Sequence, residues 1–234
     1  MAARGVFVTG TGTEVGKTVV AAAIAHTLAA KGQRVSVFKP CVTGLEEFAA
    51  DGPISGDRGG NSSDRPDHEI LRAAAGSEQS DDEIAPYRYG PPASPHLAAA
   101  LAGEEIDPGR LREAAAVAAE GADAIVCEGV GGLLVPLTSG YLVRDLAADL
   151  GYPLVVVGSP GLGTINHTLL TLGSARAAGL EVASVVLTPW PGQPTEVERS
   201  NRETIALVGE VEVQTLPRLD LSVPGDWPAL SPRR

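Results

Sequence analysis

The sequence predicts an α/β domain with a mostly parallel, doubly wound sheet of about seven strands and helices on both faces. Short apolar runs rich in Val, Ile and Leu alternate with Ala-rich helical stretches along the chain. Such alternation is typical of a parallel sheet covered on both faces. The chain of 234 residues has neither an internal repeat nor a dividing linker. We therefore expect one domain that spans residues 1–234.

A phosphate-binding loop is predicted between the first strand, residues 6–8, and the first helix, residues 19–30. Its glycines allow backbone N–H groups to surround phosphate oxygens, and the helix dipole adds to the attraction. Lys17 would contact the outer phosphates and Thr18 would ligate magnesium. The usual motif has a glycine where this chain has Thr11, so the loop is a variant. The alternative is an ordinary tight turn.

The second strand, residues 34–39, ends in Lys39. Ligands bind at the carboxyl ends of strands in open parallel sheets, so this lysine is a candidate site residue. An exposed lysine at a strand end is the alternative. Residues 45–66 have the composition of a mobile surface loop. The next helix is expected over residues 67–75, with Asp67 or Asp64 as its N-cap.

Two further helices are expected from a capping residue followed by proline, at Ser94-Pro95 and at Asp107-Pro108. A buried strand over residues 124–128 then ends in Glu128, and a glycine turn follows at 129–132. An acidic residue at this place is typical of the magnesium carboxylate in phosphate-loop enzymes. A solvent-exposed glutamate is the alternative.

The remaining elements continue the alternation. His167, near the start of the helix that begins after Gly163, is interpreted as a structural histidine. The tail from Pro217 is expected to be loop or weakly structured. Helices are expected over 142–150 and 195–208, and residues 161–167 lead into another that ends near 178–179. Strands are expected over 154–158, 182–187 and 211–216.

Composition restricts the partners. The formal net charge is −11, whereas nucleic acid and anionic membranes bind basic surfaces. No apolar run reaches about 20 residues and no leader pattern precedes the first strand, so we expect a soluble, cytoplasmic protein. Cys41 and Cys127 are interpreted as small buried residues of a reducing compartment, without a disulfide.

The motifs together resemble the dethiobiotin synthetase family over nearly the whole chain. The resemblance rests on residues 9–18, Lys39-Pro40 with Thr43-Gly44, Ser94-Pro95-His96, residues 128–132 and residues 163–167. It implies 7,8-diaminopelargonate, CO2 and ATP as substrates and Mg²⁺ as cofactor. It also implies a carbamate, a carbamic–phosphoric anhydride and closure of a ureido ring, in a homodimer whose active site is shared between subunits.

The same resemblance assigns roles to individual residues. Lys39, Lys17 and Thr13 would be catalytic, Thr18, Asp67 and Glu128 would hold the metal, and Thr43, Lys39 and Asn166 would bind substrate. Residues implied in ATP binding are Glu14, Val15, Gly16, Lys17, Thr18, Val19, Asp67, Glu128, Gly129, Val130, Gly131, Thr188, Pro189, Pro217, Arg218 and Leu219.

Relatives often recognise adenine with an Asn-Asp pair. This chain departs from that pattern, since Thr188-Pro189 stands at the same place. We therefore expect weak selection of the base. The strongest alternative class is a nucleotide-switch ATPase of the partitioning or metal-delivery type, which acts through a protein partner. Its signature lysine is absent, since Gly12 stands at that position. A relative of cobyric acid synthase would need an extra glutaminase domain.

Overall fold

The computed structural model describes residues 4–46 and 65–231. Its main sheet has six strands in the order β2-β3-β1-β6-β7-β8, and all five pairings are parallel. The fold class is therefore confirmed, with six strands in the main sheet where about seven were expected. The strands are β1 (Arg4–Gly10), β2 (Val35–Phe38), β3 (Ala124–Gly132), β6 (Leu154–Gly158), β7 (Val182–Leu187) and β8 (Val213–Thr215).

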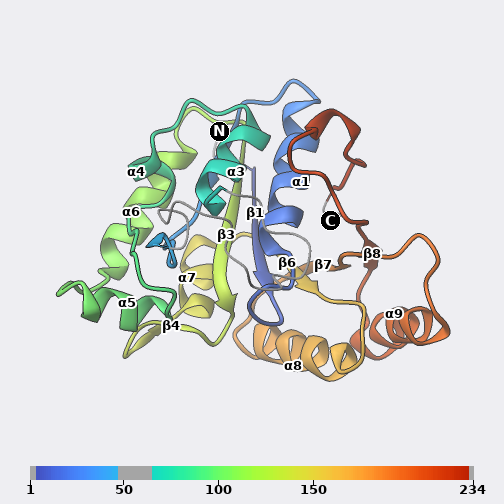
Figure 1. The fold of residues 1–234 in the computed structure, drawn as a ribbon. Coiled ribbons are helices and arrows are strands. Elements are labelled where there is room, and N and C mark those ends of the chain that lie inside the picture. Colours follow the sequence, from blue (N-terminus) through green and yellow to red (C-terminus); the bar gives the residue numbers. More distant parts are fainter. Residues whose placement is uncertain (1–3, 47–64, 232–234) are drawn as a thin grey trace.

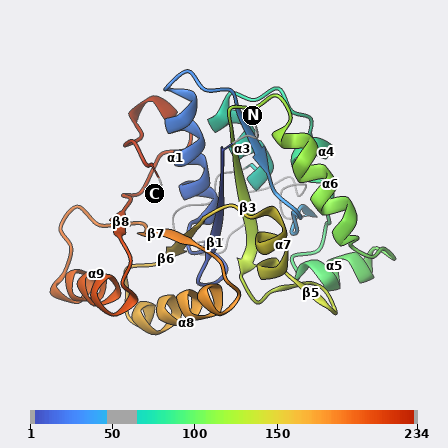
Figure 2. The ribbon, with the colours of Figure 1, turned by 180° about the vertical axis from the view of Figure 1, so that it is seen from behind.

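Helices cover both faces of this sheet (Figures 1 and 2). They are α1 (Lys17–Ala29), α3 (Asp67–Ala75), α4 (Asp81–Ile84), α5 (Pro95–Leu101), α6 (Pro108–Ala119), α7 (Val143–Leu150), α8 (Thr164–Ala177) and α9 (Glu196–Gly209). Side chains alternate across the central strand: Val6 and Val8 pack with α1 and α3, whereas Phe7 packs with α6 and α7. This alternation follows from the two-residue period of a strand and gives the sheet two apolar faces.

Three elements differ from the sequence-based expectation. The glycine turn expected at 129–132 is instead the end of β3, because Gly132 pairs with Gly10 after a register shift in β1. A separate antiparallel hairpin follows, formed by β4 (Pro136–Thr138) and β5 (Tyr141–Leu142). The short helix α4 was also not expected; the capping box between Ser80 and Glu83 stabilises its first turn.

The segment after β8 is irregular apart from a 3₁₀ turn at Pro224–Asp226, yet it packs against α1. Leu219 and Leu230 are buried there, and the Leu230 N–H donates to Thr27 Oγ1 at 2.9 Å. The tail is therefore part of the core on the α1 face. Within the described part of the chain, the helices are too short or too polar to span a lipid bilayer.

Candidate active site

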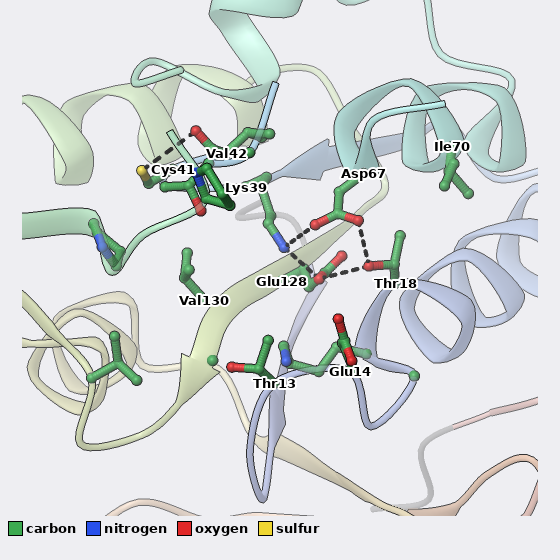
Figure 3. Close-up of a pocket in the computed structure, with 18 of the residues that line it drawn as sticks. Thr13, Glu14, Thr18, Lys39, Cys41, Val42, Asp67, Ile70, Glu128 and Val130 are labelled. Atoms are coloured by element: carbon green, nitrogen blue, oxygen red, sulfur yellow. Dashed lines mark hydrogen bonds and ion pairs between the residues drawn. The ribbon is translucent and has the colours of Figure 1, made fainter. Parts of the chain in front are cut away.

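The carboxyl ends of β1, β2 and β3 meet at a cavity of about 750 Å³. The phosphate-binding loop, the residues after β2, the start of α3 and the end of β3 line it (Figure 3). This is the edge at which open parallel sheets bind ligands. Among the predicted residues, those that line the cavity are Thr13, Glu14, Gly16, Lys17, Thr18, Val19, Lys39, Thr43, Asp67, Glu128, Val130 and Gly131.

The loop between β1 and α1 has the strained backbone that a phosphate cradle requires. Glu14 has φ 59° and Gly16 has φ 90°, and a non-glycine residue in this region costs free energy unless its surroundings hold it there. A Cβ on Gly16 would also lie 2.7 Å from Thr188 Cγ2, so glycine is required at this position. The ammonium of Lys17 lies in the loop and donates to the Gly12 carbonyl at 2.8 Å.

Four side chains from four elements form one polar cluster at the base of the cavity (Figure 3). Lys39 Nζ lies 2.5 Å from Glu128 Oε1 and 2.8 Å from Asp67 Oδ2. Thr18 Oγ1 lies 2.9 Å from Asp67 Oδ1 and 3.0 Å from Glu128 Oε1. We define the Lys39 cluster as Thr18, Lys39, Asp67 and Glu128. Both alternatives, an exposed strand-end lysine and a solvent-exposed glutamate, are wrong, because Lys39 is 3% exposed and Glu128 is fully buried.

Burial and charge shift the pKa values of this site in different directions. Burial, followed by the charge of Lys39, lowers the pKa of Lys17 to about 8. Burial also opposes charge on Lys39, but Asp67 and Glu128 outweigh it and raise the pKa of that lysine. Burial raises the pKa of Glu128, which Lys39 opposes. Burial acts upward on Asp67 too, but Lys39 holds the pKa of that carboxyl below its usual value.

The donor set of the Lys39 cluster fits magnesium. It offers two carboxylates and one hydroxyl, and Mg²⁺ in phosphate-transfer sites is usually held by one or two carboxylates with substrate phosphates and water. Glu128 Oε2 is buried and has no hydrogen-bond partner within residues 4–46 and 65–231. A buried oxygen without a partner is expected where a cation binds. In the same ranges no three His, Cys, Asp or Glu side chains are arranged to hold a metal, so Thr18 is needed to complete the set.

Several predicted residues lie outside the cavity of their own chain. Asn166 is exposed near the start of α8, and Thr188 is buried against the phosphate-binding loop. The others outside it are Val15, Gly129, Pro189, Pro217, Arg218 and Leu219. Gly129 nevertheless touches the cluster, since its carbonyl lies 3.4 Å from Lys39 Nζ. The roles of these residues stay predictions. Asp64 lies outside the described residues.

Sequence reasoning missed part of the lining. Arg65 precedes Asp67 by two residues and adds a third cation to the cavity. Leu221 comes from the C-terminal segment that packs on α1. The remaining lining residues without a predicted site role are Cys41, Val42, Gly44, Ile70, Pro92, Ala93, Ser94, Pro95 and Val135. Only Gly44, Ser94 and Pro95 belonged to a recognisable motif; the others have no local signal. Cys41 and Cys127 are buried free thiols, as predicted.

The loop, the cluster and the parallel sheet define a phosphate-loop nucleotide-binding protein, and the family model described as an AAA domain matches residues 4–222. Similar curated proteins are ATP-dependent dethiobiotin synthetases. That of Anaeromyxobacter dehalogenans strain 2CP-1 is 43% identical over 184 residues, which cover 79% of this chain and 76% of the relative. That of Bacillus subtilis strain 168 is 33% identical over 209 residues, 86% of this chain and 81% of the relative. The chain belongs to the dethiobiotin synthetase family.

The fold has wider relatives. A ParA family ATPase from Chlorobium tepidum TLS superposes with a TM-score of 0.55 at 14% identity, covering 96% of this chain and 88% of that structure. This likeness shows the fold alone.

The sequence identities to dethiobiotin synthetases confirm the predicted resemblance to that family. The alternative of a nucleotide-switch ATPase has less support.

Proposed function

We propose that this chain carboxylates 7,8-diaminopelargonate with CO2 and closes the ureido ring of dethiobiotin, with ATP as co-substrate. One amine attacks CO2 and forms a carbamate. A carbamate oxygen then attacks the γ-phosphorus, which forms a carbamic–phosphoric anhydride and releases ADP. The second amine attacks the carbamoyl carbon and expels phosphate. The observation that carries this proposal is a buried lysine, Lys39, beside the phosphate-binding loop and facing a cavity.

The residues of the cavity divide these tasks. Lys17 and the loop N–H groups bind the phosphates, and Lys39 neutralises charge on the carbamate and the transferred phosphoryl group. Thr13 and Thr43 hydrogen-bond the carbamate or diamine. Thr18, Asp67 and Glu128 would hold Mg²⁺, which supplies further neutralisation of phosphate charge when bound. Apolar lining residues support a site for the substrate's aliphatic chain: Pro92, Ala93, Pro95, Val130 and Val135.

Product analysis tests the function. Incubation with the diamine, bicarbonate, ATP and Mg²⁺ is expected to give dethiobiotin and phosphate, identified by mass spectrometry. ATP turnover that ignores the diamine but responds to an added protein would support the nucleotide switch instead. The net charge of −11 supports small-molecule partners without nucleic acid or membrane. The two buried free thiols, Cys41 and Cys127, support a reducing, cytoplasmic location.

Asp67→Asn is expected to reduce turnover about a hundredfold and to raise the Mg²⁺ concentration needed for activity, because the change removes a carboxylate from the Lys39 cluster at constant size. Asp64→Asn is the matched control and is expected to leave both quantities near wild type. The measurement is steady-state turnover over a series of Mg²⁺ concentrations. The reverse pattern would assign the metal carboxylate to Asp64.

We also expect weak discrimination between ATP and other nucleoside triphosphates, by less than about tenfold in kcat/KM, since a site without a dedicated hydrogen-bond partner rejects analogues poorly. The Thr188 hydroxyl is buried and unpartnered within the described ranges, its methyl group faces Gly16, and Pro189 has no N–H to donate. Thr188→Val, which keeps the shape, is expected to leave the ATP to CTP ratio unchanged. A thousandfold preference for ATP contradicts this prediction.

We further propose a homodimer in which Asn166 binds the substrate's carboxylate in the neighbouring subunit. Asn166 is exposed and outside its own cavity. Two exposed leucines are close to it in sequence: Leu162, just before α8, is 96% exposed, and Leu170, one helical turn after Asn166, is 65% exposed. Large exposed apolar side chains near an amide that could bind a carboxylate support a subunit interface.

Subunit mixing tests this arrangement. Lys17→Met is defective in its own loop, and Asn166→Ala is defective only in what it provides to its neighbour. Mixed dimers combine both defects in one site and leave the other intact, so random reassociation is expected to restore about a quarter of all sites. The measurement is turnover after mixing, with exchange verified by native mass spectrometry. Exchange without recovery would place Asn166 in its own subunit's site or outside any site.

A further inference from the structure

We propose that Lys39 and the divalent cation compete for the same two carboxylates, so that metal binding displaces the Lys39 ammonium from the cluster toward the reacting groups. This inference rests on the proposed function in assigning Mg²⁺ to Thr18, Asp67 and Glu128. It adds a second role for Lys39, as the cation that keeps the metal carboxylates together before the metal binds.

Lys39 already occupies both carboxylates that the metal would need. Glu128 Oε1 is contacted both by Lys39 Nζ at 2.5 Å and by Thr18 Oγ1 at 3.0 Å. Lys39 also bridges to Asp67 at 2.8 Å, so one ammonium spans both carboxylates of the predicted metal site (Figure 3). Magnesium binds oxygen at about 2.0–2.1 Å, and an ammonium in contact with the same two carboxylates would lie within a few ångströms of it. Like charges at that distance in a buried site repel strongly.

The number of charges at the cluster also favours displacement of Lys39. Glu128 is fully buried and Lys39 is 3% exposed, so the pair is shielded from water and depends on internal neutralisation. Two carboxylates bring two negative charges, which one ammonium balances in part and one divalent cation balances fully. A divalent cation at this place therefore makes the ammonium redundant there. The released ammonium is on the cavity wall, which puts it next to carbamate and phosphate oxygens.

Lys17, the second lysine of the cavity, differs from Lys39 in its contacts. Lys17 lines the same cavity, but its ammonium donates to the Gly12 carbonyl and, among the residues that the structure describes, forms no ion pair with a carboxylate. A metal arriving at Glu128 and Asp67 would leave that bond intact. Lys17 is therefore a control for the loss of one positive charge from the cavity without the loss of a competitor for the carboxylates.

The test measures metal binding without nucleotide or diamine. Mn²⁺ is titrated into wild type, Lys39→Met and Lys17→Met, and free Mn²⁺ is followed by electron paramagnetic resonance. Competition predicts that Lys39→Met tightens Mn²⁺ binding about tenfold or more, and that Lys17→Met changes it by less than about threefold. Equal tightening in the two variants would reduce the effect to net charge and overturn the proposal. Unchanged or weaker binding in Lys39→Met would also overturn it, because Lys39 would then remain beside the metal as a supporting group.

A second measurement uses the native chain and holds even where Lys39→Met folds poorly. The sequence contains three lysines, Lys17, Lys31 and Lys39, so ¹⁵N-lysine labelling gives at most three ammonium signals in nuclear magnetic resonance spectra. Lys39→Arg, which keeps the charge, and Lys31→Arg assign them. Displacement predicts that diamagnetic Mg²⁺ alone shifts the Lys39 signal and accelerates its exchange with water. A Lys39 signal that is unchanged at saturating Mg²⁺ overturns the proposal. Neither measurement involves turnover, so a failed product assay would not be confused with failure here.

Discussion

Lys39→Met is expected to reduce turnover at least about a hundredfold and to lower the free energy of unfolding by ~3–5 kcal/mol at pH 8. The catalytic loss follows from removing the charge that faces the transferred phosphoryl group. The stability loss has a separate cause: Glu128, fully buried, would lose the ammonium that lies 2.5 Å from its carboxylate. Removal of one partner from a buried ion pair leaves the other charge uncompensated.

The stability loss should depend on pH with a defined sign. Burial already raises the pKa of Glu128 above 4.5, and Lys39 opposes that shift, so the variant's Glu128 has a higher pKa still. A folded state that binds a proton more tightly than the unfolded state loses stability as pH rises. The deficit of Lys39→Met relative to wild type is therefore smallest near the unfolded pKa of Glu128 and grows as pH rises through the folded pKa.

Urea unfolding at several pH values, beside steady-state turnover, measures both effects. The double variant Lys39→Met with Glu128→Gln separates them: it removes the buried charge together with its partner, so we expect most of the stability to return while turnover stays low. Near-normal turnover in Lys39→Met would remove this residue from the mechanism. If Lys39→Met were as stable as wild type at pH 8, another group would have to neutralise Glu128.

The sequence was sufficient to predict the polar centre of the site because each member lies where an apolar or helical run begins or ends. Lys17 and Thr18 begin α1 after a glycine loop, and Asp67 is the first residue of α3. Lys39 directly follows β2, and Glu128 ends the apolar part of β3. Parallel strands place their carboxyl ends at one edge, so these local signals were enough to bring the residues together.

The apolar lining could not be predicted in the same way. Leu221 and Val135 reach the cavity because the C-terminal segment packs on α1 and because a hairpin follows β3, and neither arrangement has a local motif. The extension of β3 through Gly132 likewise depends on pairing with Gly10 from a strand over a hundred residues away in sequence. Glycine composition indicated a turn there, whereas tertiary pairing made a strand. Thr188 packs against Gly16 for the same kind of reason.

Lys17→Met is expected to reduce turnover by about a hundredfold or more, like Lys39→Met, but without loss of stability. Phosphate binding by the loop depends on this ammonium. Its folded environment, however, disfavours charge: burial, then Lys39, lowers the pKa of Lys17 to about 8. Methionine keeps most of the stem's length and removes the buried charge, and the hydrogen bond lost is one to the Gly12 carbonyl.

The difference in stability between Lys17→Met and wild type also depends on pH with a definite sign. The pKa of Lys17 is about 8 in the folded state and 10.5 in the unfolded state. Between these two pH values the unfolded state binds the proton more tightly, so the unfolding free energy of the wild type increases as pH rises. We therefore expect Lys17→Met to equal or exceed wild type in unfolding free energy at pH 7, with the advantage shrinking toward pH 10.5. Lys31→Met, at an exposed lysine whose ammonium bonds Ser231, is the control, and turnover and stability should both stay near wild type. A Lys17→Met protein that is several kcal/mol less stable than wild type at pH 7 would mean that the Gly12 bond outweighs the cost of burying the charge.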